Sequence, residues 1–230
     1  MSDLKSPRIR DESLAFFGTI IAGQSHELTN VLNIINELAG LQLDLLRAEE
    51  QGLPVNLPRL QEVAARIQHQ VHRGETIIGN INRFSHSVDL PVAVFDLKEA
   101  IERVLFLAER SARLARVELV SDLPPESIVL ESNPFCVQQA VFTCIDLALR
   151  SASDIRRVVV DYVVRGDGAE IRVTSADHLT QDENINDRLE LLQFLLESIG
   201  GSMVKGLGDE PSGILVFRVP QHHRAELEVP

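Results

Sequence analysis

Three side chains that together could manage a phosphoryl group occur in the run Ser25-His26-Glu27-Leu28-Thr29-Asn30. A neutral imidazole nitrogen is a competent nucleophile near neutral pH. Glu27 directly follows His26, and a carboxylate can fix the imidazole tautomer by accepting a hydrogen bond from the other ring nitrogen. Asn30 lies one helical turn beyond His26, on the same helix face. This arrangement is typical of an imidazole that carries a phosphoryl group to or from a partner protein.

The segment around His26 has the apolar spacing of a long helix. Apolar residues recur at heptad spacing at Leu14, Phe17, Ile21, Leu28, Val31, Ile35, Leu38 and Leu45. His26 falls at the position farthest from this seam, so we expect its ring on the outer face of the helix. The predicted helix runs from about Asp11 to Glu50 and would be roughly 60 Å long at about 1.5 Å per residue. A helix of this length needs a partner along its side.

The side chains expected on the same outer arc as His26 are small and uncharged. They are Thr19, Ala22, Gly23, Thr29, Asn30 and Asn33. A helix of another protein could approach such an arc closely without stripping water from charged groups. We therefore expect the arc to be a docking surface for a partner protein, although small residues also occur on exposed helices that bind nothing.

The composition excludes some classes of partner. The chain has 230 residues, enough for one large or two small domains. Aromatic residues make up 4% of the chain, with no Trp and one Tyr, which argues against a protein that stacks nucleic-acid bases. The net charge of -12 also opposes binding to a phosphate backbone. We therefore expect no nucleic-acid partner.

Cysteine usage and hydropathy favour a cytoplasmic protein. Cys136 and Cys144 lie in one apolar helical stretch, where a disulfide between them is geometrically excluded, so we expect buried thiols. No spacing typical of metal ligands is present, so no metal is expected. The N-terminus has no apolar signal region, and no run reaches about 18 apolar residues. No membrane association is therefore expected.

A second helical pattern follows a break that contains one Gly and two Pro, at 51–58. Its apolar positions are Leu60, Val63, Ile67, Val71, Gly74, Ile78, Ile81 and Phe84. Two long helices joined by a short loop predict an antiparallel hairpin over 11–89, after a flexible tail at 1–10. One hairpin cannot bury both apolar stripes, whereas two hairpins can form a four-helix bundle. We therefore expect a homodimer.

From residue 90 onward the pattern alternates between strand and helix. Strands are predicted at 92–96, 116–121, 127–131, 157–164, 170–174, 203–206 and 213–219. Helices are predicted at 97–114, 134–150 and 188–199. This order indicates a mixed sheet backed by helices on one face, over 90–220, with a tail at 221–230. The fold class is therefore α+β, a long helical hairpin followed by an α/β sandwich.

The two halves together resemble the cytoplasmic core of sensor histidine kinases. The H-box of that family reads His-Glu-x-x-Asn, and here it stands as His26-Glu27-Leu28-Thr29-Asn30. Residues 11–89 are similar to the dimerisation and histidine-phosphotransfer domain, and 90–220 to the catalytic ATP-binding domain, which has the Bergerat-type fold. The resemblance implies that His26 is the phosphoacceptor. It also implies that Asn30 could position a water for hydrolysis of a partner's acyl phosphate.

The chain departs from this family at the residues that bind nucleotide. The asparagine that holds Mg²⁺ corresponds to Leu147, and an earlier asparagine of the same helix to Thr143. The adenine-binding loop, Asp-x-Gly-x-Gly in the family, is Ser175-Ala176-Asp177-His178-Leu179, with neither glycine. The glycine-rich lid corresponds to Asp187-Arg188-Leu189-Glu190. Since glycines let backbone N–H groups approach phosphate and leucine offers no oxygen to a cation, we expect that ATP binding is lost and that no cofactor is held.

The intact H-box beside altered nucleotide elements favours a histidine phosphotransferase. Such a protein passes a phosphoryl group between His26 and the aspartates of response-regulator receiver domains, which supply Mg²⁺ from their own acidic pockets. It resembles bacterial phosphotransferases derived from kinases, and a sensor kinase is a further possible partner. Three alternatives stay open: a divergent active kinase, a response-regulator phosphatase that uses Asn30, and a non-enzymatic regulator that docks on a kinase or response regulator.

Overall fold

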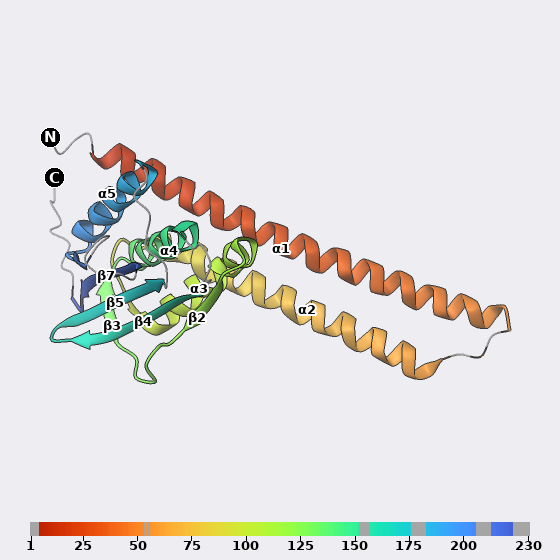
Figure 1. Ribbon diagram of the computed structural model, residues 1–230. Helices are drawn as coiled ribbons and strands as arrows, with labels where there is room; N and C mark the ends of the chain where they lie inside the picture. The colour runs from red at the N-terminus through yellow and green to blue at the C-terminus, as the bar shows by residue number, and fades with distance from the viewer. Residues whose placement is uncertain are drawn as a thin grey trace. The chain divides into compact units, whose positions relative to one another are not determined.

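The computed structural model describes residues 5–52, 54, 56–151, 157–175, 183–205 and 213–222 (Figure 1). The chain divides into two compact units. The hairpin unit is Gly18–Arg83, and the sandwich unit combines Met1–Phe17 with Phe84–Pro230. None of the helices within the described ranges has the length and apolar content needed to span a bilayer.

Parts of two helices form the hairpin unit, α1 (Lys5–Glu50) and α2 (Leu57–Ser85). The predicted break between them is confirmed, but α2 begins inside it, at Leu57. Asn56 explains this start, because its side-chain Oδ1 accepts a hydrogen bond from the backbone N–H of Arg59 at 3.0 Å. Pro58 then falls in the first turn, where a missing N–H costs nothing.

The predicted flexible tail at 1–10 is wrong for 5–10, because α1 begins at Lys5. Pro7 falls in the first turn of this helix and is compatible with it. The predicted tail at 221–230 is also wrong for its first two residues. The backbone N–H of Glu131 donates to the carbonyl of Gln221 at 2.7 Å, and His222 forms an isolated bridge with Glu131. Residues 1–4 and 223–230 lie outside the described ranges.

The apolar interior of the hairpin unit is narrow. Val31 and Leu38 of α1 and Val63 and Ile77 of α2 are buried. The two helices approach closely at Gly74, where an added Cβ would lie 3.5 Å from Cγ1 of Val31. The hairpin is therefore closed by small and branched apolar side chains at the level just beyond the H-box.

The sandwich unit contains the rest of the regular structure. Its helices are η1 (His86–Val88), α3 (Leu97–Ala115), α4 (Pro134–Ser151) and α5 (Glu183–Ser198). Its strands are β1 (Ala93–Asp96), β2 (Glu118–Ser121), β3 (Val129–Ser132), β4 (Arg157–Arg165), β5 (Gly168–Ser175), β6 (Ser202–Lys205) and β7 (Gly213–Pro220). Five strands form a sheet in the order β2-β4-β5-β7-β6, in which only the β2–β4 pair is parallel, and β1 pairs with β3 separately. The predicted mixed sheet is confirmed.

Helices α3, α4 and α5 cover one face of the five-stranded sheet (Figure 1). The alternation along β4 shows which face this is, because Val158, Val160 and Tyr162 are buried and the residues between them are partly exposed. The hydroxyl of Tyr162 donates to the carbonyl of Glu126 at 2.7 Å, which satisfies the one polar group that this row buries. The core of the unit therefore lies between this face and the three helices.

The predicted hairpin between β4 and β5 is confirmed, with a two-residue turn at Gly166-Asp167. Gly166 has a positive φ of 59°, which suits a hairpin turn of this length. At Gly168 the constraint is space, because a Cβ there would lie 2.3 Å from the backbone oxygen of Val219 on β7. Two of the glycines are thus required by the sheet itself.

Five phenylalanines form a cluster within the sandwich unit: Phe16, Phe17, Phe84, Phe135 and Phe142. The Phe16 ring lies 5.6 Å from the Phe84 ring, edge to face, and 5.1 Å from the Phe142 ring of α4. A hydrogen bond from the hydroxyl of Ser13 to Oε1 of Gln139, at 2.9 Å, lies beside it. The N-terminal turns of α1 are therefore fixed to α4.

This contact corrects the predicted seam. Leu14 was expected on the buried stripe but is 70% exposed, whereas Phe16 is buried. The heptad pattern assumed that the whole helix packs against one partner. The first turns of α1 pack on α4 instead of α2. The side of α1 that is buried there is therefore the side that faces α4.

We expect Phe16→Ala to lower the free energy of unfolding by about 3–4 kcal/mol, because it removes a buried ring from an aromatic cluster. The matched change Leu14→Ala, two residues away, should cost less than about 0.5 kcal/mol, since it alters an exposed side chain. Urea unfolding followed by circular dichroism measures both. Equal losses in the two variants would contradict the observed packing of α1.

Candidate functional site

His26 lies on the exposed side of α1, as expected. The buried side of the same helix segment carries Gln24, Glu27 and Val31 instead. Within the described part of the chain, no hydrogen bond engages the His26 ring. The imidazole is therefore open to a reacting group brought by another molecule.

Glu27 is turned inward and is 7% exposed. Its Oε2 accepts a hydrogen bond from the Arg73 guanidinium of α2 at 2.8 Å, so the pair joins the two helices of the hairpin. A buried carboxylate needs a cation or several donors to offset the water it loses. The orienting bond from Glu27 to His26 therefore stays a prediction, while the observed partner of Glu27 is an arginine.

Sequence reasoning missed Arg73. Helix α2 carries four arginines, at 59, 66, 73 and 83, and their spacing does not distinguish one from the others. The register between two long helices decides which of them meets Glu27, and the loop between the helices does not fix that register. The structure identifies Arg73 through its hydrogen bond to Glu27, which lies 46 positions earlier in the sequence.

The predicted docking arc is mostly exposed. Thr19, Ala22, Thr29, Asn30 and Asn33 are exposed, and Gly23 is partly so. The Thr29 hydroxyl donates to the carbonyl of Ser25 at 2.9 Å and is thus turned toward its own helix. The arc therefore presents small side chains around His26, and its binding of a partner stays a prediction.

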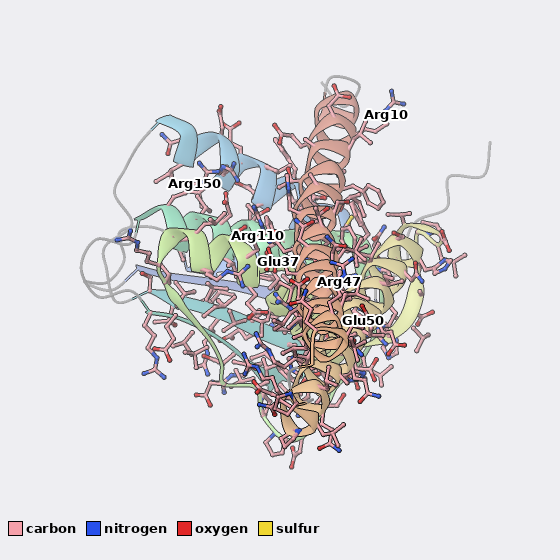
Figure 2. All side chains as sticks on the ribbon, turned by 90° about the vertical axis from the view of Figure 1, so that its right-hand side faces the viewer. Arg10, Glu37, Arg47, Glu50, Arg110 and Arg150 are labelled. Carbon is pink, nitrogen blue, oxygen red and sulfur yellow. The ribbon has the colours of Figure 1, made fainter. Side chains whose placement is uncertain are left out.

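The charge of α1 around His26 is one-sided. No Lys or Arg occurs between Arg10 and Arg47, whereas Glu27, Glu37 and Asp44 fall within that stretch. Arg10, Glu37 and Arg47 are labelled in Figure 2. Because α1 supplies no cation there, the positive charge that contacts the H-box comes from α2.

In the sandwich unit, the described positions that the resemblance relates to nucleotide-binding residues are buried. Leu147 of α4 and Ser175 at the end of β5 have no exposed surface, and Thr143 is 5% exposed. The Thr143 hydroxyl donates to the carbonyl of Gln139 at 2.8 Å, within its own helix. Asp177 lies outside the described residues. The three described positions therefore line no open cleft.

The predicted start of the last helix was wrong, because α5 begins at Glu183 and not at 188. The earlier start includes Ile185, which is buried in the core of the unit. Residues 187–190, predicted to correspond to the lid, thus lie within a helix. The sequence prediction missed this start because asparagine, present at 184 and 186, has a weak helix propensity. Burial of Ile185 between them outweighs that weak propensity.

A cluster of three charges fixes α5 to α4. Oδ2 of Asp146 lies 2.5 Å from the Arg188 guanidinium of α5 and 2.9 Å from Nε of Arg150. Arg150, which is exposed at the last turn of α4, is labelled in Figure 2. Leu147 offers no oxygen to a cation, and two arginines hold the carboxylate of the adjacent Asp146. The expectation that ATP is not bound stays a prediction.

The two thiols lie on α4, as predicted. Burial raises the pKa of the Cys144 thiol far above its usual range. It also raises the pKa of the partly buried Cys136 thiol, although a hydrogen bond with the Ser198 side chain opposes this shift. Both are therefore poor nucleophiles at neutral pH. Within the described ranges, no group of three His, Cys, Asp or Glu side chains is placed to hold a metal ion.

Comparison with known proteins relates the fold, but not the sequence, to a known class. No protein family model matches the chain, and no curated protein matches it. The nucleotide-free catalytic domain of histidine kinase ThkA superposes with a TM-score of 0.50 at 14% identity, covering 58% of this chain and 97% of that domain. The sandwich has the fold of a histidine-kinase catalytic domain.

Two further solved structures are similar. Another nucleotide-free form of the ThkA catalytic domain has a TM-score of 0.50 at 15% identity, covering 59% of this chain and 100% of that one. The histidine kinase AdeS of Acinetobacter baumannii has a TM-score of 0.48 at 14% identity, covering 85% of this chain and 98% of that one. Identities this low establish the α+β fold alone, so the chemistry is argued from the residues of this chain.

We expect Leu147→Asn, which introduces the asparagine that the resemblance to kinases predicts at this position, to lower the free energy of unfolding by about 3 kcal/mol or more. It removes a buried apolar side chain and buries an amide in its place. The matched change Arg150→Asn, on the same helix, should cost less than about 1 kcal/mol, because the Arg150 side chain is 59% exposed and Asp146 keeps its ion pair with Arg188. Chemical unfolding measures both, and a harmless Leu147→Asn would show that this position faces open space.

Proposed function

We propose that the protein is a histidine phosphotransferase of two-component signalling. His26 accepts a phosphoryl group from the aspartyl phosphate of one response-regulator receiver domain and passes it to another. The observation that carries the proposal is the exposed, unengaged imidazole of the H-box, on a chain whose kinase-like sandwich buries the positions where nucleotide would bind. Such a chain has a phosphoacceptor but takes its phosphate from another protein.

The transfer needs no cofactor of this chain. A ring nitrogen of neutral His26 attacks the phosphorus of the aspartyl phosphate, and the N–P bond forms as the P–O bond to the aspartyl group breaks. The aspartate leaves as a carboxylate with the electron pair. The phosphorylated imidazolium then releases its ring proton to solvent. Transfer to a second receiver domain runs through the same steps in reverse.

The docking arc suits such a partner. A receiver domain must bring its phosphorylated aspartate, and the Mg²⁺ bound beside it, within bonding distance of His26. Small exposed side chains at Ala22, Thr29 and Asn33 let a helix of the receiver approach α1 closely. The cation in the reaction therefore comes with the partner.

ATP is not the phosphoryl donor in this proposal. The described nucleotide positions lie in the core, and Ile185 and Arg188 tie α5 to it through apolar contact and the ion pair with Asp146. A nucleotide would have to displace part of a packed core before it could bind. Burial of these positions favours the phosphotransferase over a divergent active kinase.

We also propose that two copies pair through their hairpin units. Helix α2 carries an apolar stripe of perfect heptad spacing at Leu57, Ala64, Val71 and Ile78, and all four side chains are exposed. Helix α1 has exposed leucines at 32, 43 and 46. Since the interior of the hairpin unit leaves these stripes uncovered, a second copy that buries them would complete a four-helix bundle.

We expect the double change Val71→Glu and Ile78→Glu to convert a dimer into a single chain of 25.5 kDa, because it places carboxylates on the apolar stripe of α2. The matched change Gln68→Glu, at an exposed polar position of the same helix, should leave the dimer intact. Light scattering after size exclusion gives the mass. A dimer that survives the double change would contradict this interface.

We expect His26→Ala to abolish phosphoryl acceptance from a labelled, phosphorylated receiver domain while leaving circular dichroism and mass unchanged, because the exposed ring contributes little to packing. His69→Ala, at an exposed histidine of α2, should accept label like the unaltered protein. Label that persists in His26→Ala would contradict the proposal. Receiver binding without any label on either variant would favour the docking regulator.

A further inference from the structure

We propose that the ion pair of Glu27 with Arg73 fixes the register of α1 against α2. It thereby aligns the exposed apolar stripes of the two helices, which a second copy of this chain would cover. The inference rests on the pairing of two copies proposed above and deepens it. It gives the ion pair a role in recognition between copies that is independent of the chemistry of His26.

The ion pair is a direct polar link between the two helices of the hairpin unit. A guanidinium nitrogen of Arg73 lies 2.8 Å from Oε2 of Glu27, and the Glu27 side chain is 9% exposed. A contact this short between charged groups is strong and directional. Because it joins residues that are 46 positions apart, it forms at one offset between the helices and is lost at others.

The apolar interior of the unit leaves that offset less defined. The buried residues Val31 and Leu38 of α1 are seven positions apart, and the buried residues Val63 and Ile77 of α2 are fourteen apart. Both spacings are multiples of the heptad. A slip of one heptad, about 10 Å at about 1.5 Å per residue, therefore keeps apolar side chains facing each other.

The same slip would break the ion pair. It would bring Arg73 to the level of Ile20 or of Ile34, the residues seven positions before and after Glu27. Ile20 is buried and Ile34 partly buried, and neither has an oxygen that can accept a hydrogen bond from a guanidinium. An arginine beside apolar side chains has lost water without gaining a partner, and this cost is absent at the observed register.

At the observed register, exposed leucines of the two helices lie at the same level. Leu43 follows Glu27 by 16 residues, and Leu57 precedes Arg73 by 16 residues. Since α1 and α2 are antiparallel (Figure 1), both leucines lie about 24 Å from the ion pair along the hairpin. Leu43 is 54% exposed and Leu57 is 63% exposed. A slip of one heptad would separate their levels by about 10 Å, so that a second copy would no longer bury both stripes along their length.

The test measures the register by double electron–electron resonance. Spin labels are attached at Asn36→Cys of α1 and Thr76→Cys of α2, both exposed positions, in a chain whose two native cysteines are replaced by alanine. Dilution of the labelled chain into unlabelled chain restricts the measured distance to one hairpin. The double variant Glu27→Leu with Arg73→Leu replaces the ion pair by apolar side chains, and Arg66→Leu is the control.

Arg66 is a matched control, because it precedes Arg73 by seven residues and has the same heptad position. Its guanidinium approaches the Glu62 carboxylate at 4.0 Å, and its side chain is 55% exposed. Since Glu62 also belongs to α2, loss of this contact leaves the link between the two helices unchanged.

We expect one distance in the unaltered protein and in Arg66→Leu. The double variant should show a second population, displaced by up to about 10 Å. Its melting temperature should stay equal or rise, because apolar replacement of a buried ion pair is often neutral or stabilising. If about a third of its chains keep the observed register, the dissociation constant of the dimer should rise about tenfold, because both copies must have that register. Sedimentation equilibrium measures this constant.

A single distance in the double variant, equal to that in Arg66→Leu, overturns the inference and assigns the register to packing such as that of Gly74 on Val31. A second population with an unchanged dissociation constant supports the register role and overturns the alignment of the stripes. If the double variant does not fold, Glu27→Gln with Arg73→Gln takes its place with the same expected results. Failure of the proposed pairing is a different result, since the unaltered protein would then have the mass of one chain at every concentration. The measured distances would still decide the register.

Discussion

Burial of helix α4 is the constraint on which the rest of the sandwich depends. Its residues from Pro134 to Leu149 are buried or partly buried, between the sheet, α3 and α5. Phe135 and Phe142 extend this core to the first turns of α1, and Asp146 extends it to α5. Once Leu147 is part of that core, the position cannot also serve a cation. The fold of a kinase catalytic domain is held together here by packing that includes Leu147.

The hairpin shows the opposite distribution of polarity. Where an apolar contact would be expected below His26, it buries Gln24 and the ion pair of Glu27 with Arg73. A buried pair is poor evidence for stability, because desolvation offsets much of the attraction. What it does here is join α1 to α2 at the level of the H-box. The core of the sandwich is thus mainly apolar, whereas the interior of the hairpin includes a buried ion pair.

Much of this architecture follows from local pattern. The strands and α3 were predicted to within a few residues, because strand alternation and the apolar spacing of a helix are local patterns. The exposure of His26 followed from the heptad count. Two predictions failed because they depend on tertiary contacts: the exposed Leu14 and the early start of α5 at Glu183. Arg73 could not be predicted, because the register of two long helices is set by side-chain packing that no spacing along one helix reveals.

The choice of phosphoryl donor tests the central claim most directly. The unaltered protein would be incubated in parallel with γ-labelled ATP and Mg²⁺ and with a labelled, phosphorylated receiver domain, and the label on the protein compared over time. The account predicts acid-labile label, typical of a phosphoramidate, from the receiver domain and none from ATP. Label from ATP alone would contradict it, because the buried positions of α4 and β5 would then have to open and bind nucleotide.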